Sequence, residues 1–166
     1  MSERTPFDLA AYIERSTRGP CFVCALLAGD PAYAHHVIHE DARSVAFLNR
    51  YPILAGYTLV APRAHLTEVT GDFSEAAFLD LQRLVWRVGE AVRRAMGAER
   101  IYLASLGSRA ANAHVHWHVA PLPPGVPLEE QQFAAMDVAR AGVLALNHGE
   151  MAAIAARIRA ELDQLG

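Results

Sequence analysis

The chain has 166 residues, of which 52% are hydrophobic and 20% are charged, and its formal net charge is -3. This length and composition predict one folded domain with short additions and exclude a disordered chain. The charge gives no overall basic surface, so we expect no binding of long nucleic acid. All 15 basic residues are arginine, which excludes a phosphate-loop lysine and Schiff-base chemistry.

No stretch of the sequence approaches the roughly 20 apolar residues that a membrane-spanning helix needs. The first ten residues are polar and acidic and do not resemble a secretion signal. We therefore expect a cytoplasmic protein without a membrane partner.

The N-terminal region predicts a short helix followed by a pair of cysteines. Residues 7–18 carry a weak helical pattern that residues 19–20 end, so residues 1–19 are predicted to form an N-terminal helical decoration. Cys21 and Cys24 are the only cysteines, and without a secretion signal this spacing favours metal or redox chemistry over a structural disulfide. A thioredoxin-type redox motif needs a βαβ unit, and no clear parallel strand precedes the pair.

Extended segments and one long helix predict the fold class. The run Asp72-Phe73-Ser74-Glu75 matches a capping box with Asp72 as the N-cap, and apolar positions then repeat at helical spacing until Gly97. Runs bounded by turn residues predict five strands, at residues 35–39, 44–48, 57–61, 101–106 and 114–120. The sequence therefore predicts an α+β domain, in which one long helix packs on an antiparallel five-stranded sheet.

Prolines after residue 120 end the last predicted strand. Beyond them, residues 131–145 and 150–165 have helical patterns. We expect the domain to span residues 20–125 and a C-terminal helical extension to span residues 126–166. The extension is predicted to pack on the domain or on a second subunit.

Residues His114 to His118 read His-Val-His-Trp-His, and the period of two predicts three histidines on one face of a strand. Val115, Trp117 and Val119 would then line the other face, with Trp117 in the core. One interpretation is three surface histidines on a half-exposed strand. A second is a metal site, and a third is catalysis by one imidazole that the others position.

The remaining histidines and two arginines carry weaker signals. His35, His36 and His39 lie on the first predicted strand, where a surface or edge role is favoured over metal binding. Arg50 and Arg63 flank predicted strands and could attract phosphate, although exposed arginines commonly just solvate the surface.

At the triad the sequence resembles a known family, the histidine triad (HIT) superfamily. The family signature is His-x-His-x-His followed by two apolar residues, and it is matched by His114, His116, His118, Val119 and Ala120. The resemblance extends over roughly residues 20–121. Four more motifs occur in the family's order and spacing: Cys21-Phe22-Val23-Cys24, Val45-Ala46-Phe47-Leu48-Asn49, Gly56-Tyr57-Thr58-Leu59-Val60 and Pro62-Arg63-Ala64-His65.

The resemblance implies a homodimer that binds nucleotides in a groove over the histidine strand. It implies a hydrolase that cleaves dinucleoside polyphosphates or nucleoside phosphoramidates at the α-phosphorus. His116 would be the nucleophile and form a covalent nucleotidyl-histidine, His118 would contact the phosphate, and Asn49 would lie beside the nucleoside. A largely neutral imidazole is a competent nucleophile at pH 7. No carboxylate cluster accompanies the triad, so the sequence demands no divalent cation for catalysis.

Zinc-containing branches of the superfamily imply a structural metal site in this chain. Zinc takes four nitrogen or sulfur ligands, and Cys-x-x-Cys supplies two of them. The resemblance gives His65 and His114 as the other two, so Cys21, Cys24, His65 and His114 would form a closed zinc site. A thiol pair without metal is the alternative.

The segment before the triad departs from the family pattern. Many members carry Gly-Gln and a Ser or Thr there, whereas residues 108–113 read Ser-Arg-Ala-Ala-Asn-Ala. Ser105, Ser108 and Asn112 are the candidates to replace those groups, and Ser108 and Asn112 are predicted to bind the nucleotide. Three other functions stay open: a nucleotidyltransferase or phosphorylase, a non-catalytic zinc-stabilised nucleotide-binding module, and an enzyme with one catalytic metal on all three histidines.

Overall fold

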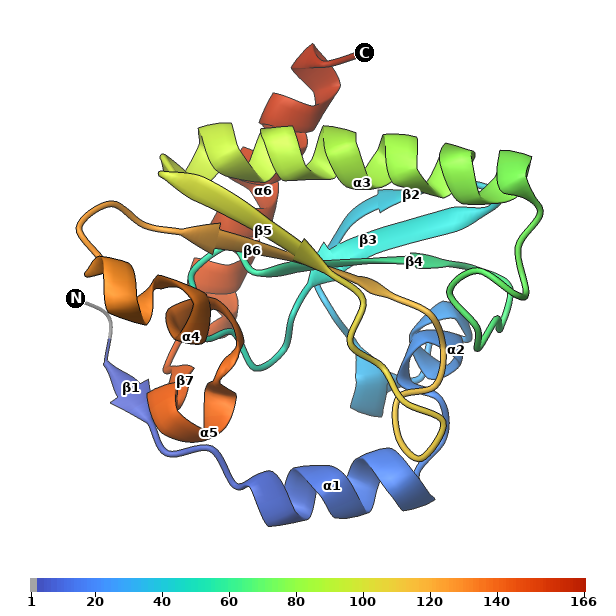
Figure 1. Ribbon diagram of the computed structural model, residues 1–166, viewed down its shortest axis with the longest axis horizontal. Helices are drawn as coiled ribbons and strands as arrows, with labels where there is room; N and C mark the ends of the chain where they lie inside the picture. Colours follow the sequence, from blue (N-terminus) through green and yellow to red (C-terminus); the bar gives the residue numbers. More distant parts are fainter. Residues whose placement is uncertain (1–2) are drawn as a thin grey trace.

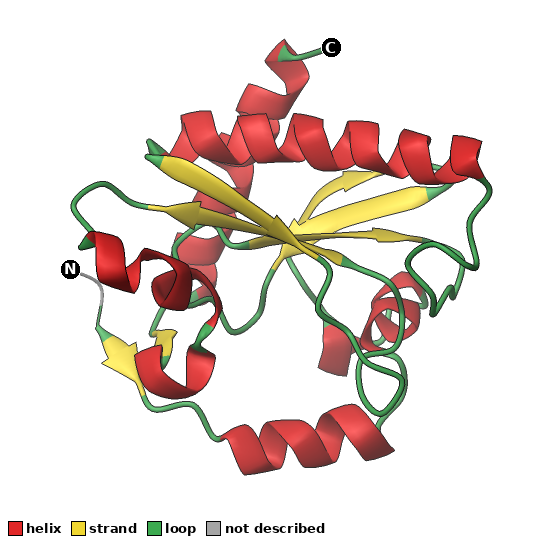
Figure 2. Ribbon diagram, viewed as in Figure 1, coloured by secondary structure: helices red, strands yellow, loops and turns green. Residues whose placement is uncertain are grey.

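The computed structural model describes residues 3–166, so residues 1–2 of the predicted N-terminal decoration lie outside the described residues. A five-stranded antiparallel sheet with the strand order β2-β3-β4-β6-β5 forms its centre (Figure 1). The predicted α+β class and the predicted number of strands in this sheet are confirmed (Figure 2). The strands are β2 (Val37–Glu40), β3 (Ser44–Leu48), β4 (Thr58–Pro62), β5 (Arg100–Ala104) and β6 (Trp117–Leu122).

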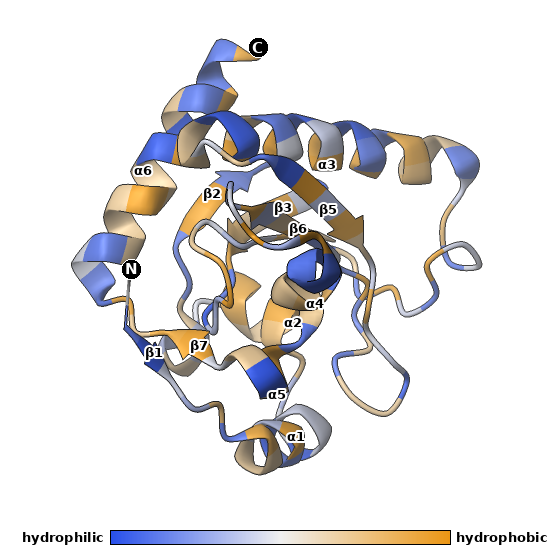
Figure 3. Ribbon diagram, turned by 60° about the vertical axis from the view of Figure 1, so that its left-hand side comes forward, coloured by the Kyte–Doolittle hydropathy of each residue, from blue (hydrophilic) through white to orange (hydrophobic). Residues whose placement is uncertain are grey.

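One face of the sheet is covered by two helices, α3 (Glu75–Met96) and α6 (His148–Gln164) (Figure 1). Figure 3 shows α3 as a mixture of hydrophilic and hydrophobic residues, as expected of a helix with one buried side. The buried side of α3 packs on Val60 and Val119 of the sheet. The residues that α6 adds to this core are Met151, Ile154, Ala155, Ile158 and Leu162.

The opposite face of the sheet carries shorter helices. α2 (Phe22–Leu27) and α4 (Gln131–Met136) pack there through Val23 and Ala135, in a second core with Phe47. Farther from the sheet on the same side lies α1 (Leu9–Arg18), none of whose residues is buried (Figure 1).

A two-stranded sheet joins the N-terminal segment to the segment before α6, because β1 (Arg4–Thr5) pairs with β7 (Val143–Leu144). The prediction of one helix over residues 131–145 is therefore wrong. α4 ends at Asp137. The same residue is the N-cap of α5 (Val138–Ala141), because its carboxylate accepts a hydrogen bond from the backbone N–H of Arg140. Gly142 then turns the chain with φ 66°, so close to the carbonyl of Thr5 that no Cβ would fit. Two 3₁₀ helices, η1 (Pro31–Tyr33) and η2 (Leu128–Glu130), lie in the connections.

The ends of α3 test the predicted capping box. Ser74 is the N-cap, and its hydroxyl accepts a hydrogen bond from the N–H of Ala77, so the prediction of Asp72 as the cap is wrong. The carboxylate of Asp72 instead accepts hydrogen bonds from the N–H groups of Thr67 and Glu68 in the preceding loop. The predicted end at Gly97 is confirmed by its φ of 61°.

Within residues 3–166, no helix has the length and apolar character needed to cross a membrane.

The histidine strand begins later and ends later than predicted. It continues through Pro121 to Leu122, where both residues pair with β5, so the prediction that the prolines after residue 120 end the strand is wrong. β6 begins at Trp117, so His114 and His116 precede the strand and only His118 lies on it. The pairing of β6 with β4 stops at Val60 opposite Trp117. Two residues farther on, β4 reaches Pro62, which has no N–H to continue the ladder. The predicted alternation does hold where the strand exists, since Trp117 and Val119 pack towards α3.

The packing of α6 leads to a prediction about stability. Ile158 is fully buried, and Ile158→Ala should lower the free energy of unfolding by about 2–5 kcal/mol, because it leaves a cavity between α6 and the sheet. Urea denaturation should give one transition with a lower midpoint. The exposed α6 residue Asp163 provides the control, and Asp163→Ala should change the free energy by less than about 0.5 kcal/mol. Equal stabilities of the two variants would show that α6 does not contribute to the cooperative core.

Candidate active site and metal centre

His114 is held by hydrogen bonding on one side of its ring and faces the cysteine pair on the other. It is 1% exposed, and its Nε2–H donates to the carbonyl of Pro62 at 2.8 Å. A carbonyl only accepts, so this contact places the proton on Nε2 and leaves Nδ1 with a lone pair. Nδ1 lies 3.4 Å from Sγ of Cys21 and 3.7 Å from Sγ of Cys24.

Four side chains meet at this point in a geometry that could hold a metal ion. One ligand atom from each of Cys21, Cys24, His65 and His114 lies within 4.8 Å of all the others. Sγ of Cys24 is 3.4 Å from Nδ1 of His65. A tetrahedral zinc ion with bonds of about 2.3 Å to sulfur and about 2.0–2.1 Å to nitrogen separates such ligands by roughly 3.5 Å. The donor set and its spacing therefore fit zinc.

The two thiols differ in acidity because their surroundings differ. Burial opposes ionisation of Cys21, but its side-chain contact with His114 and the hydrogen bond from the N–H of Cys24 outweigh it and lower the pKa to about 6. Burial and the neighbouring Cys21 raise the pKa of Cys24 to about 11. Cys21 also caps the start of α2, which places the second cysteine one turn away on the same side. The pair offers one ready thiolate, and a cation would stabilise the second.

His116 has a fixed tautomer and an open nitrogen. Its Nδ1–H donates to the backbone carbonyl of His114 at 2.7 Å, so Nε2 carries a lone pair. The ring lines a cleft, yet it is only 4% exposed, and this burial lowers its pKa. Gly107 packs against the ring, where the carbonyl of Asn112 leaves no space for a Cβ. Neutral His116 therefore presents one unprotonated nitrogen to the cleft.

His118 lies beside His116, with 4.8 Å between the ring centroids. Burial, followed by the nearby His116, lowers the pKa of His118 to about 3, so the ring is neutral at pH 7. Burial also raises the pKa of Tyr57 to about 12, so its hydroxyl keeps its proton and donates to Nδ1 of His118 at 3.1 Å. The remaining proton of His118 is then on Nε2, which is buried without a partner in the described part of the chain.

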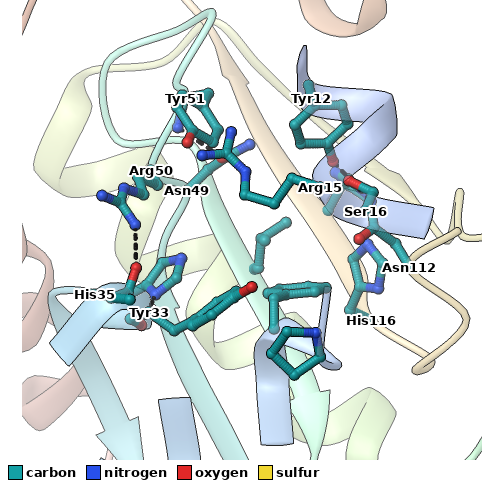
Figure 4. A pocket seen from close by; sticks show the side chains of 15 residues that line it. Tyr12, Arg15, Ser16, Tyr33, His35, Asn49, Arg50, Tyr51, Asn112 and His116 are labelled. Atoms are coloured by element: carbon teal, nitrogen blue, oxygen red, sulfur yellow. Dashed lines mark hydrogen bonds between the residues drawn. The ribbon is translucent and has the colours of Figure 1, made fainter. Parts of the chain in front are cut away.

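The cleft above these histidines has walls from three parts of the chain (Figure 4). Tyr12, Arg15 and Ser16 of α1 face Asn49, Arg50 and Tyr51, which follow β3. Phe22 of α2 forms the floor beside His116, with 5.2 Å between the two ring centroids. No Asp or Glu occurs among the described residues that line the cleft, so it favours an anion.

The loop before the triad brings one of its two predicted nucleotide-binding residues into the cleft. Asn112 lines the cleft and has a left-handed backbone with φ 52°, which asparagine tolerates. Its side-chain amide donates to the hydroxyl of Tyr12 at 2.7 Å. Ser108 pairs instead with Ala111 in a turn outside the cleft lining. The hydroxyl of Ser105 donates to the carbonyl of His116.

Several cleft residues gave no clear signal in the sequence. His35, for which a surface role is predicted, lines the cleft, with its ring centroid 4.9 Å from that of Phe47. The α1 residues reach the cleft only through the fold, so no local pattern could reveal them. Tyr57, which belongs to the motif Gly56-Tyr57-Thr58-Leu59-Val60, contacts His118 from outside the cleft lining. Arg50 lines the cleft, as the phosphate interpretation requires, whereas Arg63 forms an ion pair with Glu40.

The structure does not assemble the three histidines around one metal. Both ring nitrogens of His114 are directed elsewhere, one to Pro62 and the other to the cysteine pair. Within residues 3–166, the cluster with metal-ligand spacing is the one that contains Cys21 and Cys24. The geometry therefore separates a metal centre from a cleft with His116 and His118.

Comparison with known proteins gives matches over most of the sheet and the cleft. A family model described as HIT domain matches residues 31–124, more than half of the chain. An uncharacterised HIT-like protein of Mycobacterium tuberculosis is 36% identical over 106 residues, which are 61% of this chain and 71% of that protein. The match to the family model leaves α1 and the helices after β6 outside its bounds.

A more distant relative has a named activity. The adenosine 5′-monophosphoramidase hnt1 of Schizosaccharomyces pombe is 27% identical over 129 residues, which are 70% of this chain and 92% of that protein. Among solved structures, a Zn-bound histidine triad family protein from Mycobacterium smegmatis has a TM-score of 0.65 at 23% identity. That alignment covers 87% of this chain and 94% of the other and shows a shared fold.

Proposed function

This chain belongs to the HIT domain family, and from that premise we propose that it is a nucleotide hydrolase acting through His116. The substrates would be dinucleoside polyphosphates or nucleoside phosphoramidates, cleaved at the α-phosphorus. The observation that carries the proposal is the open Nε2 of His116, which the hydrogen bond from Nδ1–H to the carbonyl of His114 keeps unprotonated. A relative that is an adenosine 5′-monophosphoramidase supports this class of reaction.

The proposed chemistry has two displacements at phosphorus. In the first, the lone pair of His116 Nε2 forms a bond to the α-phosphorus while the bond from phosphorus to the leaving group breaks. The leaving group departs with that electron pair, as an anion from a polyphosphate or as an amine that takes a proton from solvent. In the second, water attacks the same phosphorus, gives up a proton, and releases the nucleoside monophosphate and free His116. The unpartnered Nε2–H of His118 is suited to donate to a phosphoryl oxygen in both steps.

The nucleophile leads to a kinetic prediction. His116→Ala should lower hydrolysis of diadenosine tetraphosphate and adenosine phosphoramidate by at least about a thousandfold, because no other group can form the covalent intermediate. Product release measured by chromatography gives the rates. The control is His36→Ala, since the His36 ring packs on His148 and does not line the cleft, and it should keep the wild-type rate.

The same assay separates the alternatives. Unchanged hydrolysis in His116→Ala would contradict the assignment of the nucleophile. Adding inorganic phosphate to the wild type should leave the nucleoside monophosphate as the product. A nucleoside diphosphate that appears only with added phosphate would instead indicate a phosphorylase. Tight nucleotide binding without turnover of either substrate would indicate a non-catalytic binding module.

We infer that Cys21, Cys24, His65 and His114 bind a structural zinc ion. The support is the closeness of their ligand atoms, which lie within 4.8 Å of one another, and the Pro62 carbonyl, which orients His114 as a ligand. A site with four protein ligands is closed, so it stabilises the fold by binding and takes no part in the chemistry. Cys21 and Cys24 form no disulfide. Cysteines that stay reduced are expected in a reducing compartment, which accords with the cytoplasmic location that we propose.

The zinc site leads to a prediction about metal content. Elemental analysis should find one zinc per chain in the wild type and in His116→Ala, but none in Cys24→Ser. Because metal binding adds to the folding free energy, Cys24→Ser should also lower Tm by several degrees. A metal that Cys24→Ser retains and His116→Ala loses would contradict the structural site and support a catalytic metal on the triad.

We also propose that the protein is a homodimer that joins through β5 and α3. β5 is an edge strand, and an unpaired edge invites pairing with another chain. Two large apolar side chains beside this edge are exposed: Trp86 of α3 by 64% and Leu103 of β5 by 48%. Leu103 approaches Gly89, one turn from Trp86, so β5 and α3 share this apolar surface.

The proposed interface leads to a prediction about the mass in solution. Light scattering after size exclusion should give twice the chain mass for the wild type and a single chain mass for Trp86→Glu, because a buried carboxylate destabilises the interface. Leu128, which is 82% exposed on η2, supplies the control, and Leu128→Glu should stay dimeric. A monomeric wild type, or a Trp86→Glu dimer, would contradict this interface.

A further inference from the structure

The end of the cleft opposite His116 carries two positively charged side chains (Figure 4). Arg15 and Arg50 both line it, and no carboxylate does among the described residues. Arg15 forms no ion pair within residues 3–166, and its guanidinium carbon lies 5.3 Å from the centroid of the Tyr51 ring. Arg50 uses one guanidinium nitrogen to donate to the carbonyl of Ala32, which leaves its other N–H groups free.

Asn49 presents a hydrogen-bond donor at the same end of the cleft. Its side-chain carbonyl oxygen accepts a hydrogen bond from the N–H of Tyr51 at 3.0 Å. That contact fixes the amide, so the NH₂ group is the part left to meet a ligand. Figure 4 shows Asn49, Arg15 and Tyr51 grouped together across the cleft from His116. The polar groups here are donors, and they suit an acceptor with several oxygens.

Contacts of α1 with the rest of the protein fix the position of Arg15. Tyr12, one turn earlier, accepts the hydrogen bond from Asn112. Its ring also packs edge-on against Tyr51, with 6.0 Å between centroids. Phe7 contacts both tyrosine rings, at 5.2 and 5.5 Å. These contacts hold α1 over the cleft although the helix has no buried residue, and they keep Arg15 above the cleft opening.

We propose that Arg15, Asn49 and Arg50 form a subsite for a second phosphate group of the ligand, separate from the phosphate that His116 attacks. This inference rests on the proposed nucleotide site and narrows its ligands to those with two or more phosphates. Phosphate fits because guanidinium groups bind its oxygens by paired, charge-assisted hydrogen bonds. Two sources share this chemistry: a distal phosphate of a polyphosphate chain and a phosphate on the ribose 2′ or 3′ oxygen.

Binding of four nucleotides tests the subsite without requiring turnover. AMP has one phosphate, whereas ADP, adenosine 2′,5′-bisphosphate and adenosine 3′,5′-bisphosphate each add one at a different place. Calorimetry with the wild type should show that at least one of these three two-phosphate nucleotides binds about tenfold or more tighter than AMP, as expected for charge-assisted hydrogen bonds. In Arg15→Gln that gain should fall to about threefold or less. The ligand whose gain depends on Arg15 identifies the source of the second phosphate.

Arg18 provides the matched control on the same helix. It pairs with Glu14, does not line the cleft, and Arg18→Gln should keep the wild-type gain. Equal affinity of the wild type for AMP and for all three two-phosphate nucleotides would overturn the subsite while leaving the proposed nucleotide site intact. The subsite would also be overturned if the gain in affinity from the second phosphate persisted in Arg15→Gln, or if Arg18→Gln lost that gain equally. Failure of the wild type to bind any of the four would remove both.

Discussion

The hydrogen bond from Nε2–H of His114 to the carbonyl of Pro62 is the interaction on which the two centres of this structure depend. It turns Nδ1 of His114 towards Cys21 and Cys24, which completes a set of four metal ligands. The backbone carbonyl of the same residue accepts a hydrogen bond from Nδ1–H of His116, which leaves His116 Nε2 open to the cleft. His114 therefore links the ligand cluster to the proposed nucleophile His116, and a metal bound there would stiffen the segment that orients the His116 ring.

The start of β6 explains how three histidines in a row acquire three different surroundings. If the strand began at His114, all three rings would point the same way. Pro62 cannot extend the ladder, and the N–H of Val115 instead donates to the carbonyl of Leu66, so His114 leaves the sheet and turns to the cysteines. His118 stays on the strand beside Tyr57, and His116 lies between the two environments. The remaining wall of the cleft comes from α1, outside the part of the chain that the family model matches.

The sequence predicted the layers of the fold better than the details of the cleft. Periodicity located the five strands and the long helix, because each buries an apolar face that repeats along the chain. The cap of α3 was missed because Asp72 and Ser74 are equally good N-caps, and only the loop at Thr67 decides which one serves the helix. Residues 131–145 were predicted as one helix because the break at Gly142 depends on Thr5, far away in the sequence. The triad and the cysteine motif indicated the residues that meet at the metal cluster, whereas His35 and Arg15 reach the cleft through tertiary packing alone.

The most direct measurement of the central claim is the mass of the intact protein, quenched during turnover of diadenosine tetraphosphate and then mapped by peptide. A covalent intermediate on the open nitrogen of His116 predicts a population heavier by one adenylyl group, with the added mass on the peptide that contains His116. The mass should be lost in acid, because a phosphoramidate hydrolyses there. An adduct on another residue, or turnover at full rate with no adduct at any quench time, would contradict the account.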